Sequence, residues 1–518
     1  MKARKNPFLD QPRRPRKPFI SRSGKILFIN PNLMKPVVTP VAIDYLAQAM
    51  EEKGFTTEIL DLAFGDDPEK ELERYLGKCE YLLIALTVRN IDDSYFASQD
   101  FCLQRTKVII DQIRGRTEAP LVLGGVGFSI RPESALSYCG VEMGVKGDGE
   151  WSLPQLAERL VERGDLRNIP GVIFKKKENY HQNPVRFGSL YGLCLSRREA
   201  LDHLRYLREG GMVGFETKRG CDQKCIYCAD PLSKGRIIRW RNPQDVAAEL
   251  AHLYRKGVDH FHTCDSEFNL PASQAIEVCK EIVKKRLNEK IRWYAYASAT
   301  PFEEELASWM ERAGCVGIDF GVDHGNDQML RRLGRAHNAA AVEKTARLAR
   351  KHGFALMFDL LLGGPGETRE TIRETIELMK KTSPDRVGIS LGVRLYQGTA
   401  LAQMVVREEG FGLKNKNLHG AIRGNEEMLQ PIFYLSAGLG EDVEEFIEKQ
   451  IAGDPRFLLG SRKNLERNYN YNENSRLTEA IKQGYRGAFW DILRRMGNGL
   501  ERTIQSPPVA TGKNESCR

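Results

Sequence analysis

The sequence predicts an α/β protein in which two parallel-sheet units follow one another: a doubly wound sheet, then a partial (βα)6 barrel, with a mixed, mainly helical C-terminal region. Short runs of Val, Ile and Leu alternate with amphipathic stretches, the pattern of parallel strands covered by helices. That alternation is interrupted once, between residues 166 and 210, and then begins again. The chain of 518 residues, 41% of them hydrophobic, has ample material for several cores.

The first unit is expected over residues 25–165. Its helical stretches lie near residues 41–52 and 104–113, and its strands are KILFIN, TTEILDL, YLLIALTV, APLVLGG and GVEMGV. A doubly wound sheet binds its ligands at the carboxyl ends of its strands, so we expect a ligand site there.

A linker with a short hairpin (171–177) is expected over residues 166–210, and the barrel over 211–402. The barrel strands are GFETKR, HFHTC, RWYAY, GIDFGV, ALMFDLLL and RVGISLG. Barrels of this kind carry their active sites at the carboxyl ends of the strands.

Residues 403–496 are expected to cap the barrel mouth. An amphipathic helix is predicted over 475–496, because Leu477, Ile481, Ala488 and Ile492 keep roughly helical spacing. The segments 1–24 and 497–518 are expected to be disordered.

Charge and cysteine usage narrow the possible functions. The net charge is +9, but the first 25 residues hold nine Lys and Arg and a single Asp, so the folded body is nearly neutral. We therefore do not expect nucleic acid as a partner. No apolar run reaches the ~18 residues of a membrane span, and no signal peptide is evident. Eleven cysteines, an odd number, do not indicate a disulfide framework, and we expect a cytoplasmic protein.

The strongest local signal is the triplet Cys221, Cys225 and Cys228, directly after the first barrel strand. Three thiolates within eight residues can converge on one soft metal centre. Zinc is the competing interpretation, but a structural zinc site is usually closed by two separated pairs of ligands. Iron–sulfur clusters commonly take four cysteines, so three cysteines would leave one iron open to a reactant.

This C-x-x-x-C-x-x-C spacing, with Tyr227 before the last cysteine, resembles the radical S-adenosylmethionine (SAM) enzymes. The resemblance implies that the three cysteines hold a [4Fe–4S] cluster whose open iron binds SAM. It also implies SAM contacts from Tyr227, from Glu267 after the second strand and from Asp323, where the family more often has Glu.

Glycines supply the remaining expected SAM contacts. Gly363 and Gly364 close the fifth strand, and Gly388 lies on the sixth. By resemblance they let SAM approach the backbone, since glycine has no side chain to block it. A turn with a helix cap explains the first pair equally well, and a buried strand explains Gly388.

The first unit resembles the cobalamin-binding domain of the cobalamin-dependent radical SAM class. Gly124, Gly125 and Gly127 would let the nucleotide tail of the corrin pass, and Thr87 would hydrogen-bond it. An ordinary Rossmann-like turn is the alternative for these glycines.

The loop after the first strand, residues 30–35, has no histidine that could bind cobalt from below. The resemblance to the tryptophan C-methyltransferase branch gives Arg89 the place facing the lower side of cobalt. The alternative for Arg89 is a pairing with Asp92 or Asp93.

The leading functional prediction is a cobalamin-dependent radical SAM enzyme that methylates an unreactive carbon of a small molecule. Its implied cofactors are a [4Fe–4S] cluster, SAM and cobalamin, and its implied partner is an electron donor such as flavodoxin or ferredoxin. The main alternative has a degenerate first unit and catalyses a non-methylating rearrangement, cyclisation or coupling. Methylthiolation of transfer RNA, and a non-enzymatic metal-containing nucleic-acid-binding protein, are further alternatives.

Overall fold

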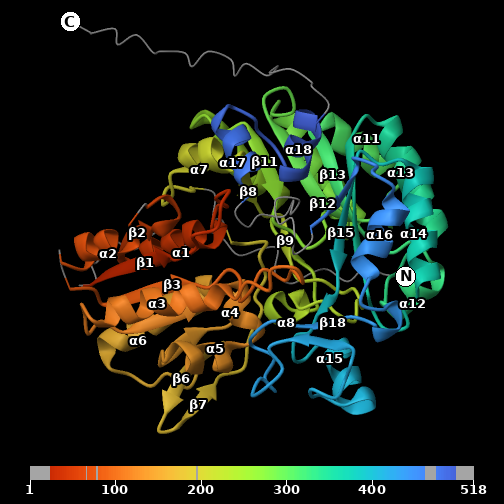
Figure 1. The fold of residues 1–518 in the computed structure, drawn as a ribbon. Coiled ribbons are helices and arrows are strands. Elements are labelled where there is room, and N and C mark those ends of the chain that lie inside the picture. Colours follow the sequence, from red (N-terminus) through yellow and green to blue (C-terminus); the bar gives the residue numbers. More distant parts are fainter. Residues whose placement is uncertain (1–23, 66, 78–79, 194–196, 461–473, 498–518) are drawn as a thin grey trace, which may run out of the picture.

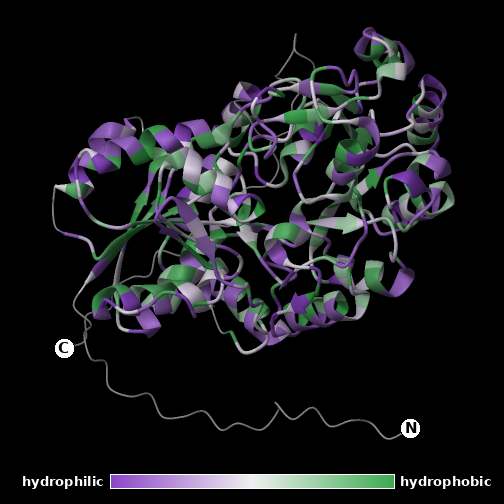
Figure 2. Ribbon diagram, turned by 90° about the horizontal axis from the view of Figure 1, so that it is seen from below, coloured by the Kyte–Doolittle hydropathy of each residue, from purple (hydrophilic) through white to green (hydrophobic). Residues whose placement is uncertain are grey.

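The computed structural model describes residues 24–65, 67–77, 80–193, 197–460 and 474–497. Two seven-stranded sheets form two units that lie side by side, the first at the left of Figure 1 and the second at the right. Figure 2 shows apolar residues on the strands and on the inner sides of the helices, and polar residues on the outer sides. The predicted α/β class and its two parallel-sheet units are confirmed.

The first sheet has the strand order β2-β1-β3-β4-β5-β6-β7, and its first five strands are parallel. Helices α1 and α6 pack on one face, and α2, α3 and α5 pack on the other. Its strands are β1 (Lys25–Asn30), β2 (Thr56–Asp61), β3 (Leu83–Thr87), β4 (Leu121–Gly124), β5 (Met143–Val145), β6 (Val172–Lys176) and β7 (Asn179–Gln182). Its helices are α1 (Val41–Glu52), the short η1 (Leu62–Phe64), α2 (Pro68–Leu76), α3 (Cys102–Arg114), α4 (Val126–Ile130), α5 (Pro132–Cys139) and α6 (Gly149–Glu162).

The hairpin expected inside the linker belongs to this sheet. Strand β6 pairs antiparallel with β5, and β7 continues the edge. The first unit therefore extends beyond residue 165, because the hairpin pairs with the otherwise open edge of β5.

The second sheet has the order β19-β15-β14-β13-β12-β11-β8, with all neighbours parallel. The six predicted barrel strands are present, and β19 adds a seventh that the sequence pattern did not reveal. The strands are β8 (Val213–Phe215), β11 (His260–Thr263), β12 (Arg292–Ser298), β13 (Cys315–Asp323), β14 (Ala355–Leu362), β15 (Arg386–Leu391) and β19 (Phe457–Leu459). The helices are α7 (His203–Gly210), α8 (Asp230–Lys234), α9 (Pro243–Arg255), α10 (Ala272–Lys284), α11 (Glu304–Arg312), α12 (Asp327–Arg332), α13 (Ala339–Lys351) and α14 (Arg369–Thr382). A two-stranded ribbon, β9 (Lys218–Arg219) with β10 (Arg239–Trp240), flanks the cysteine loop.

Side chains alternate along the barrel strands, as the period of a β-strand requires. Trp293, Phe320 and Phe358 belong to the buried core beneath the outer helices. Their strand neighbours of opposite parity, among them Tyr294 and Asp319, are therefore directed to the barrel lumen.

The C-terminal region differs from the expected cap. The predicted helix 475–496 is two helices, α17 (Ser475–Lys482) and α18 (Phe489–Gly497), because Gly484 and Gly487 take positive φ angles of 104° and 112°. Trp490 of α18 packs with Tyr294 and Met357 at the amino ends of the strands, opposite the mouth.

A small antiparallel sheet lies near the mouth instead, where it packs against Tyr227 of the cysteine loop. Its order is β16-β18-β17. The elements of this region are β16 (Val393–Arg394), α15 (Ala400–Met404), η2 (Val405–Glu409), β17 (Leu418–Gly420), β18 (Ile432–Tyr434), η3 (Ala437–Leu439) and α16 (Val443–Ile451).

Buried ion pairs join the two units. Arg198, before the barrel, donates to Asp44 of α1 (2.7 Å) and to Glu249 of α9 (2.5 Å). Arg394 of β16 donates twice to Asp92, which follows β3, at 2.9 and 2.7 Å. Among the described residues, no helix is long and apolar enough to cross a membrane. The terminal segments expected to be disordered lie outside the described residues, apart from Gly24 and Gly497.

Candidate active site

The three cysteines lie on the loop that leaves the first barrel strand at its carboxyl end. The loop is anchored at both ends: the Cys221 amide donates to the Gly235 carbonyl (3.1 Å) and the Ile226 amide to the Leu333 carbonyl (3.0 Å). A Cβ at Gly334 would lie 2.3 Å from the Lys224 carbonyl oxygen, so only glycine permits this close approach of the two loops.

The donor set suits an iron–sulfur cluster. Within the described part of the chain, no three His, Cys, Asp or Glu side chains are grouped closely enough to hold a single metal ion. A cluster with several irons uses cysteines spaced around it. Burial raises the pKa of Cys221 to about 11, so these thiols need the positive charge of a metal to ionise at neutral pH.

Arg335 connects the cysteine loop to the other expected SAM contacts. Its guanidinium lies 3.1 Å from Cys225 Sγ, 3.4 Å from an Asp323 carboxylate oxygen and 4.0 Å from one of Glu267. Tyr227 donates its hydroxyl hydrogen to Asp323. The structure thus brings Tyr227, Glu267 and Asp323 together beside the cysteines. Sequence reasoning missed Arg335; its only signal is the Gly-Arg pair after a short helix.

Burial dominates the electrostatics of this cluster. It raises the pKa of Glu267 to about 7, with Asp323 adding to the effect and Arg335 opposing it. Burial also lowers the pKa of Lys218 to about 8; this ammonium donates to the Phe268 carbonyl and, at 3.2 Å, to Gln274. At neutral pH, Glu267 is therefore divided between its charged and neutral forms.

The glycine turn after β14 also borders the mouth. Gly363 has a φ of 94°, and a Cβ there would lie 2.5 Å from Leu435. Thr368 is the N-cap of α14, as the turn-and-cap alternative expects, whereas Glu367 pairs with the buried His324 at 2.9 Å. Gly364 meets Leu333 and Gly388 lies within β15, so the packing of these glycines is consistent with both interpretations.

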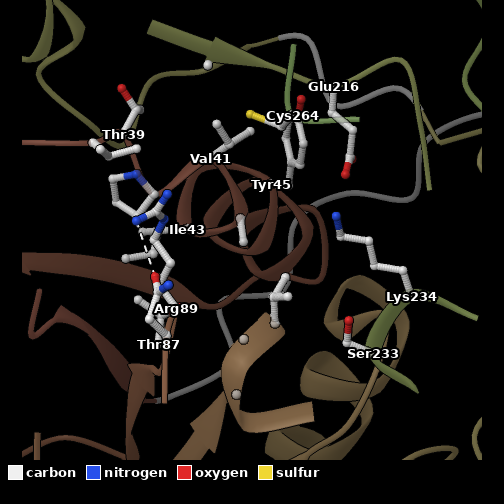
Figure 3. A pocket seen from close by; sticks show the side chains of 18 of the residues that line it. Thr39, Val41, Ile43, Tyr45, Thr87, Arg89, Glu216, Ser233, Lys234 and Cys264 are labelled. Carbon is white, nitrogen blue, oxygen red and sulfur yellow. Dashed lines mark hydrogen bonds between the residues drawn. The ribbon is translucent and has the colours of Figure 1, made fainter. Parts of the chain in front are cut away.

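A cavity of about 660 Å³ lies between the carboxyl edge of the first sheet and the barrel. Thr87, Arg89, Gly124 and Gly125 line it, as the sequence predicts for a cobalamin site. Figure 3 shows Thr39, Thr87 and Arg89 on one side of the cavity, and Ser233 and Lys234 on the other. Gly127 is not part of the lining; a Cβ there would lie 2.9 Å from the Arg89 carbonyl oxygen, so it holds the loop beside Arg89.

The cavity fits a cobalamin that has no histidine below the cobalt. The sole histidine that lines its described part is His262 of β11, in the second unit. Burial lowers the pKa of His262 to about 4, and its Nδ1 lies 2.8 Å from the Thr263 carbonyl oxygen. Of the carboxylates near Arg89, Asp92 pairs with Arg394, and Asp93 accepts from the Tyr95 amide (3.1 Å). Arg89 itself donates to the Asn90 side chain at 3.2 Å.

Ion pairs connect the cobalamin-type unit to the strand that enters the cysteine loop. Arg219, two residues before Cys221, binds Asp148 (3.1 Å) and Glu150 (2.6 Å) of the first unit. Arg239 also binds Asp148. The sequence does not reveal these pairs, because Arg219 is 71 residues from Asp148 and 69 from Glu150.

The three-cysteine loop at the barrel mouth lies between Arg219 and Asp230, which line the cavity at the ligand edge of the doubly wound sheet. This combination defines an enzyme class with two cofactors. Residues 215–379 match the model of the radical SAM superfamily, and residues 34–157 match that of the B12 binding domain. Tryptophan 2-C-methyltransferase from Streptomyces laurentii is 30% identical to the chain, over 90% of the chain and 96% of the relative.

Solved structures agree with this assignment. The radical SAM methyltransferase TsrM from Kitasatospora setae, bound to its tryptophan substrate and a SAM analogue, has a TM-score of 0.85 at 30% identity. The match covers 92% of this chain and 98% of TsrM. The same enzyme with cobalamin and a [4Fe–4S] cluster bound has a TM-score of 0.83 at 29% identity, covering 92% of this chain and 99% of that one.

The chain belongs to the cobalamin-dependent radical SAM methyltransferase family that includes tryptophan 2-C-methyltransferase. It is a C-methyltransferase with a [4Fe–4S] cluster, SAM and cobalamin as its cofactors. The leading prediction from the sequence is thereby confirmed, and it is favoured over a degenerate first unit.

Proposed function

We propose that the methyl acceptor is a carbon atom of a small aromatic amino acid of the tryptophan type. The observation that carries the proposal is the shared cavity, which reaches from Arg89 at the edge of the first sheet to Tyr296 in the barrel lumen. The bound substrate of the 30% identical TsrM, tryptophan, supports an aromatic acceptor.

Cobalamin bound in the cavity would supply the transfer of a methyl group from SAM to the acceptor carbon. The part of this chain is binding, orientation and exclusion of water. Cys221, Cys225 and Cys228 would hold the cluster. Tyr227, Glu267 and Asp323, fixed by Arg335, would orient SAM beside it, with Gly363, Gly364 and Gly388 leaving room for its nucleoside.

Thr87, Gly124 and Gly125 would border the cobalamin tail, and Gly127 would hold the loop that carries Arg89. Arg89 would occupy the lower face of the corrin in place of a histidine. We further propose reduction of the cluster by flavodoxin or ferredoxin in a reducing, cytoplasmic setting.

The test is anaerobic reconstitution of the full chain with iron, sulfide and cobalamin, followed by turnover with trideuteromethyl-SAM and a panel of small aromatic compounds. We expect one labelled methyl group on a carbon of the tryptophan-type substrate, located by NMR. Transfer to nitrogen or oxygen, or a product only with a non-aromatic acceptor, would overturn the proposal.

The role of Arg89 has a separate readout. Arg89→Ala is expected to change the visible spectrum of bound cobalamin, and the exposed Arg74→Ala is expected to leave it as it is. An unchanged spectrum in Arg89→Ala would remove Arg89 from the lower face.

A further inference from the structure

Two aspartates on neighbouring barrel strands lie in the lumen and take no part in the chemistry described above. Asp319 lies on β13 and is 3% exposed; its carboxyl group hydrogen-bonds that of Asp359 on β14. Two carboxyl groups in contact cannot both carry a full charge, so the pair shares a proton in the ligand-free protein.

The pair presents an unsatisfied acceptor to the cavity. Asp319 lines the cavity, and its Oδ1 atom has no hydrogen-bond partner among the described residues. A buried acceptor without a partner is costly for a folded protein, and a ligand with a donor group would remove that cost.

The charged groups around Asp319 determine whether the donor group of a ligand is cationic or neutral. The charged groups that act on Asp319 are Asp359 and Glu267, and both are acidic. His262 on β11 is neutral at physiological pH because burial lowers its pKa to about 4. Arg335, which donates to the Gly321 carbonyl of β13, is engaged by Asp323 and Cys225. The lumen at this depth therefore attracts a cation.

The shape of the site admits an aromatic ring beside that cation. Tyr296 lies beside Asp319 in the β12–β13 register and is 41% exposed, and the ring of His262 packs against it at 4.5 Å. Gly388 lies beside Asp359 in the β14–β15 register and leaves space without a side chain. Trp490 of α18, which lines the same cavity, has a buried Nε1 with no hydrogen-bond partner in the described structure.

We propose that Asp319 and Asp359 bind the primary ammonium group of the substrate, with Tyr296 packed against its aromatic ring. The proposal rests on the proposed function, since it defines the acceptor as an aromatic amine. The proton balance follows from the pair: when the ammonium enters, both carboxyl groups ionise, and the shared proton leaves to solvent.

The test measures binding to the reconstituted full chain by calorimetry in two buffers of different ionisation enthalpy. The probes are L-tryptophan, tryptamine (an amine without a carboxylate) and indole-3-propionate (a carboxylate without an amine). We expect tryptamine to bind with release of up to one proton, and indole-3-propionate to bind about 10- to 100-fold more weakly, the factor for a charge-assisted hydrogen bond.

Asp319→Asn and Asp359→Asn are expected to weaken tryptamine binding by about 10- to 100-fold and to leave indole-3-propionate binding as it is. The matched control is the exposed Asp165→Asn. Iron and cobalt contents report whether each variant folds. Should neither variant fold, proton release by the unmodified protein still decides the question, because tryptamine binding without it would overturn the proposal.

Other outcomes would also contradict the proposal that Asp319 and Asp359 bind the ammonium group. Equal binding of the two indole probes, or unchanged tryptamine binding in both variants, would overturn it. Loss of SAM binding in the variants, with amine binding retained, would assign the pair to SAM instead.

Different results would refute the proposed methyl acceptor and the proposed ammonium site. Binding of amines through the pair without any methylated product would refute only the acceptor. Equal methylation of tryptamine by the variants and the unmodified protein would refute only the ammonium site.

Discussion

The ion pair between Asp92 and Arg394 gives a quantitative test of how the two units are held together. Asp92 follows β3 of the cobalamin-binding unit, three residues after Arg89, and Arg394 lies on β16 of the second unit. Their side chains are 0% and 4% exposed. We consider Arg394→Met, Asp92→Asn and the double variant.

The expected magnitude follows from the contacts. Arg394→Met removes two charge-assisted hydrogen bonds, at 2.9 and 2.7 Å, and leaves the buried carboxylate with Ser94 and Tyr396. Breaking a buried pair in this way costs about 3 to 5 kcal/mol. Asp92→Asn leaves a guanidinium that still donates to the carbonyls of Met428 (3.1 Å) and Leu429 (3.2 Å), so its cost is smaller, about 2 to 3 kcal/mol. The double variant should cost less than the sum, because neither charge is left unpaired.

Native-state proteolysis measures the opening of this interface. A cost of 3 to 5 kcal/mol raises the population of the open form by about 10² to 10³-fold or more, and cleavage accelerates in proportion when opening and closing are fast. The control is Arg407→Met at an exposed arginine. Cleavage within a few-fold of the unmodified protein in Arg394→Met, or strictly additive effects in the double variant, would refute the reasoning.

Three further predictions concern the cofactor sites. Cys225→Ala should abolish iron binding and turnover in the reconstituted protein, whereas Cys102→Ala should retain both; iron retained by Cys225→Ala would exclude it as a ligand. Glu267→Gln should flatten the pH dependence of stability in the cluster-free protein: a pKa raised to about 7 favours folding below pH 4.5, and that contribution of about 2 to 4 kcal/mol is lost as the pH rises through 7. Parallel urea-unfolding profiles for Glu267→Gln and the unmodified protein between pH 5 and 8 would contradict this. Gly127→Ala should weaken cobalamin binding, measured by spectroscopic titration, because its Cβ would displace the Arg89 loop.

The sequence predicts the regular elements closely where local pattern decides them. Strand β1 and helices such as α1 have the predicted bounds, because strand period and helix amphipathicity are local properties. Strand β19 escaped prediction because three residues carry too little pattern, and only its pairing with β15 makes it a strand. The break between α17 and α18 depends on Gly484 and Gly487. Of the two, Gly487 packs against Tyr294 and donates its amide to the Gly211 carbonyl at 2.9 Å, contacts that no local pattern reveals.

The candidate site likewise contains residues that local sequence pattern predicts and residues that only tertiary contacts bring together. The cysteine triplet is contiguous, so its spacing alone predicts a metal centre. Arg335 is 110 residues from Cys225, and no local pattern reports a contact over that distance. In the sequence, Asp319 and Asp359 are likewise ordinary strand residues. Only the parallel register of β13 and β14 places them together.

The position of α18 has a consequence for how the enzyme is entered. Trp490 and Ala488, packed with Tyr294 and Met357, fill the lumen at the amino ends of the strands, and Tyr294 donates to Asp491 at 2.8 Å to hold the helix there. Among the described residues, these side chains form the floor of a chamber, so small molecules would reach its depth past the carboxyl ends of the strands or from the cobalamin side. A truncation that trims the chain before α18 would remove the floor of the chamber and admit water from behind the substrate.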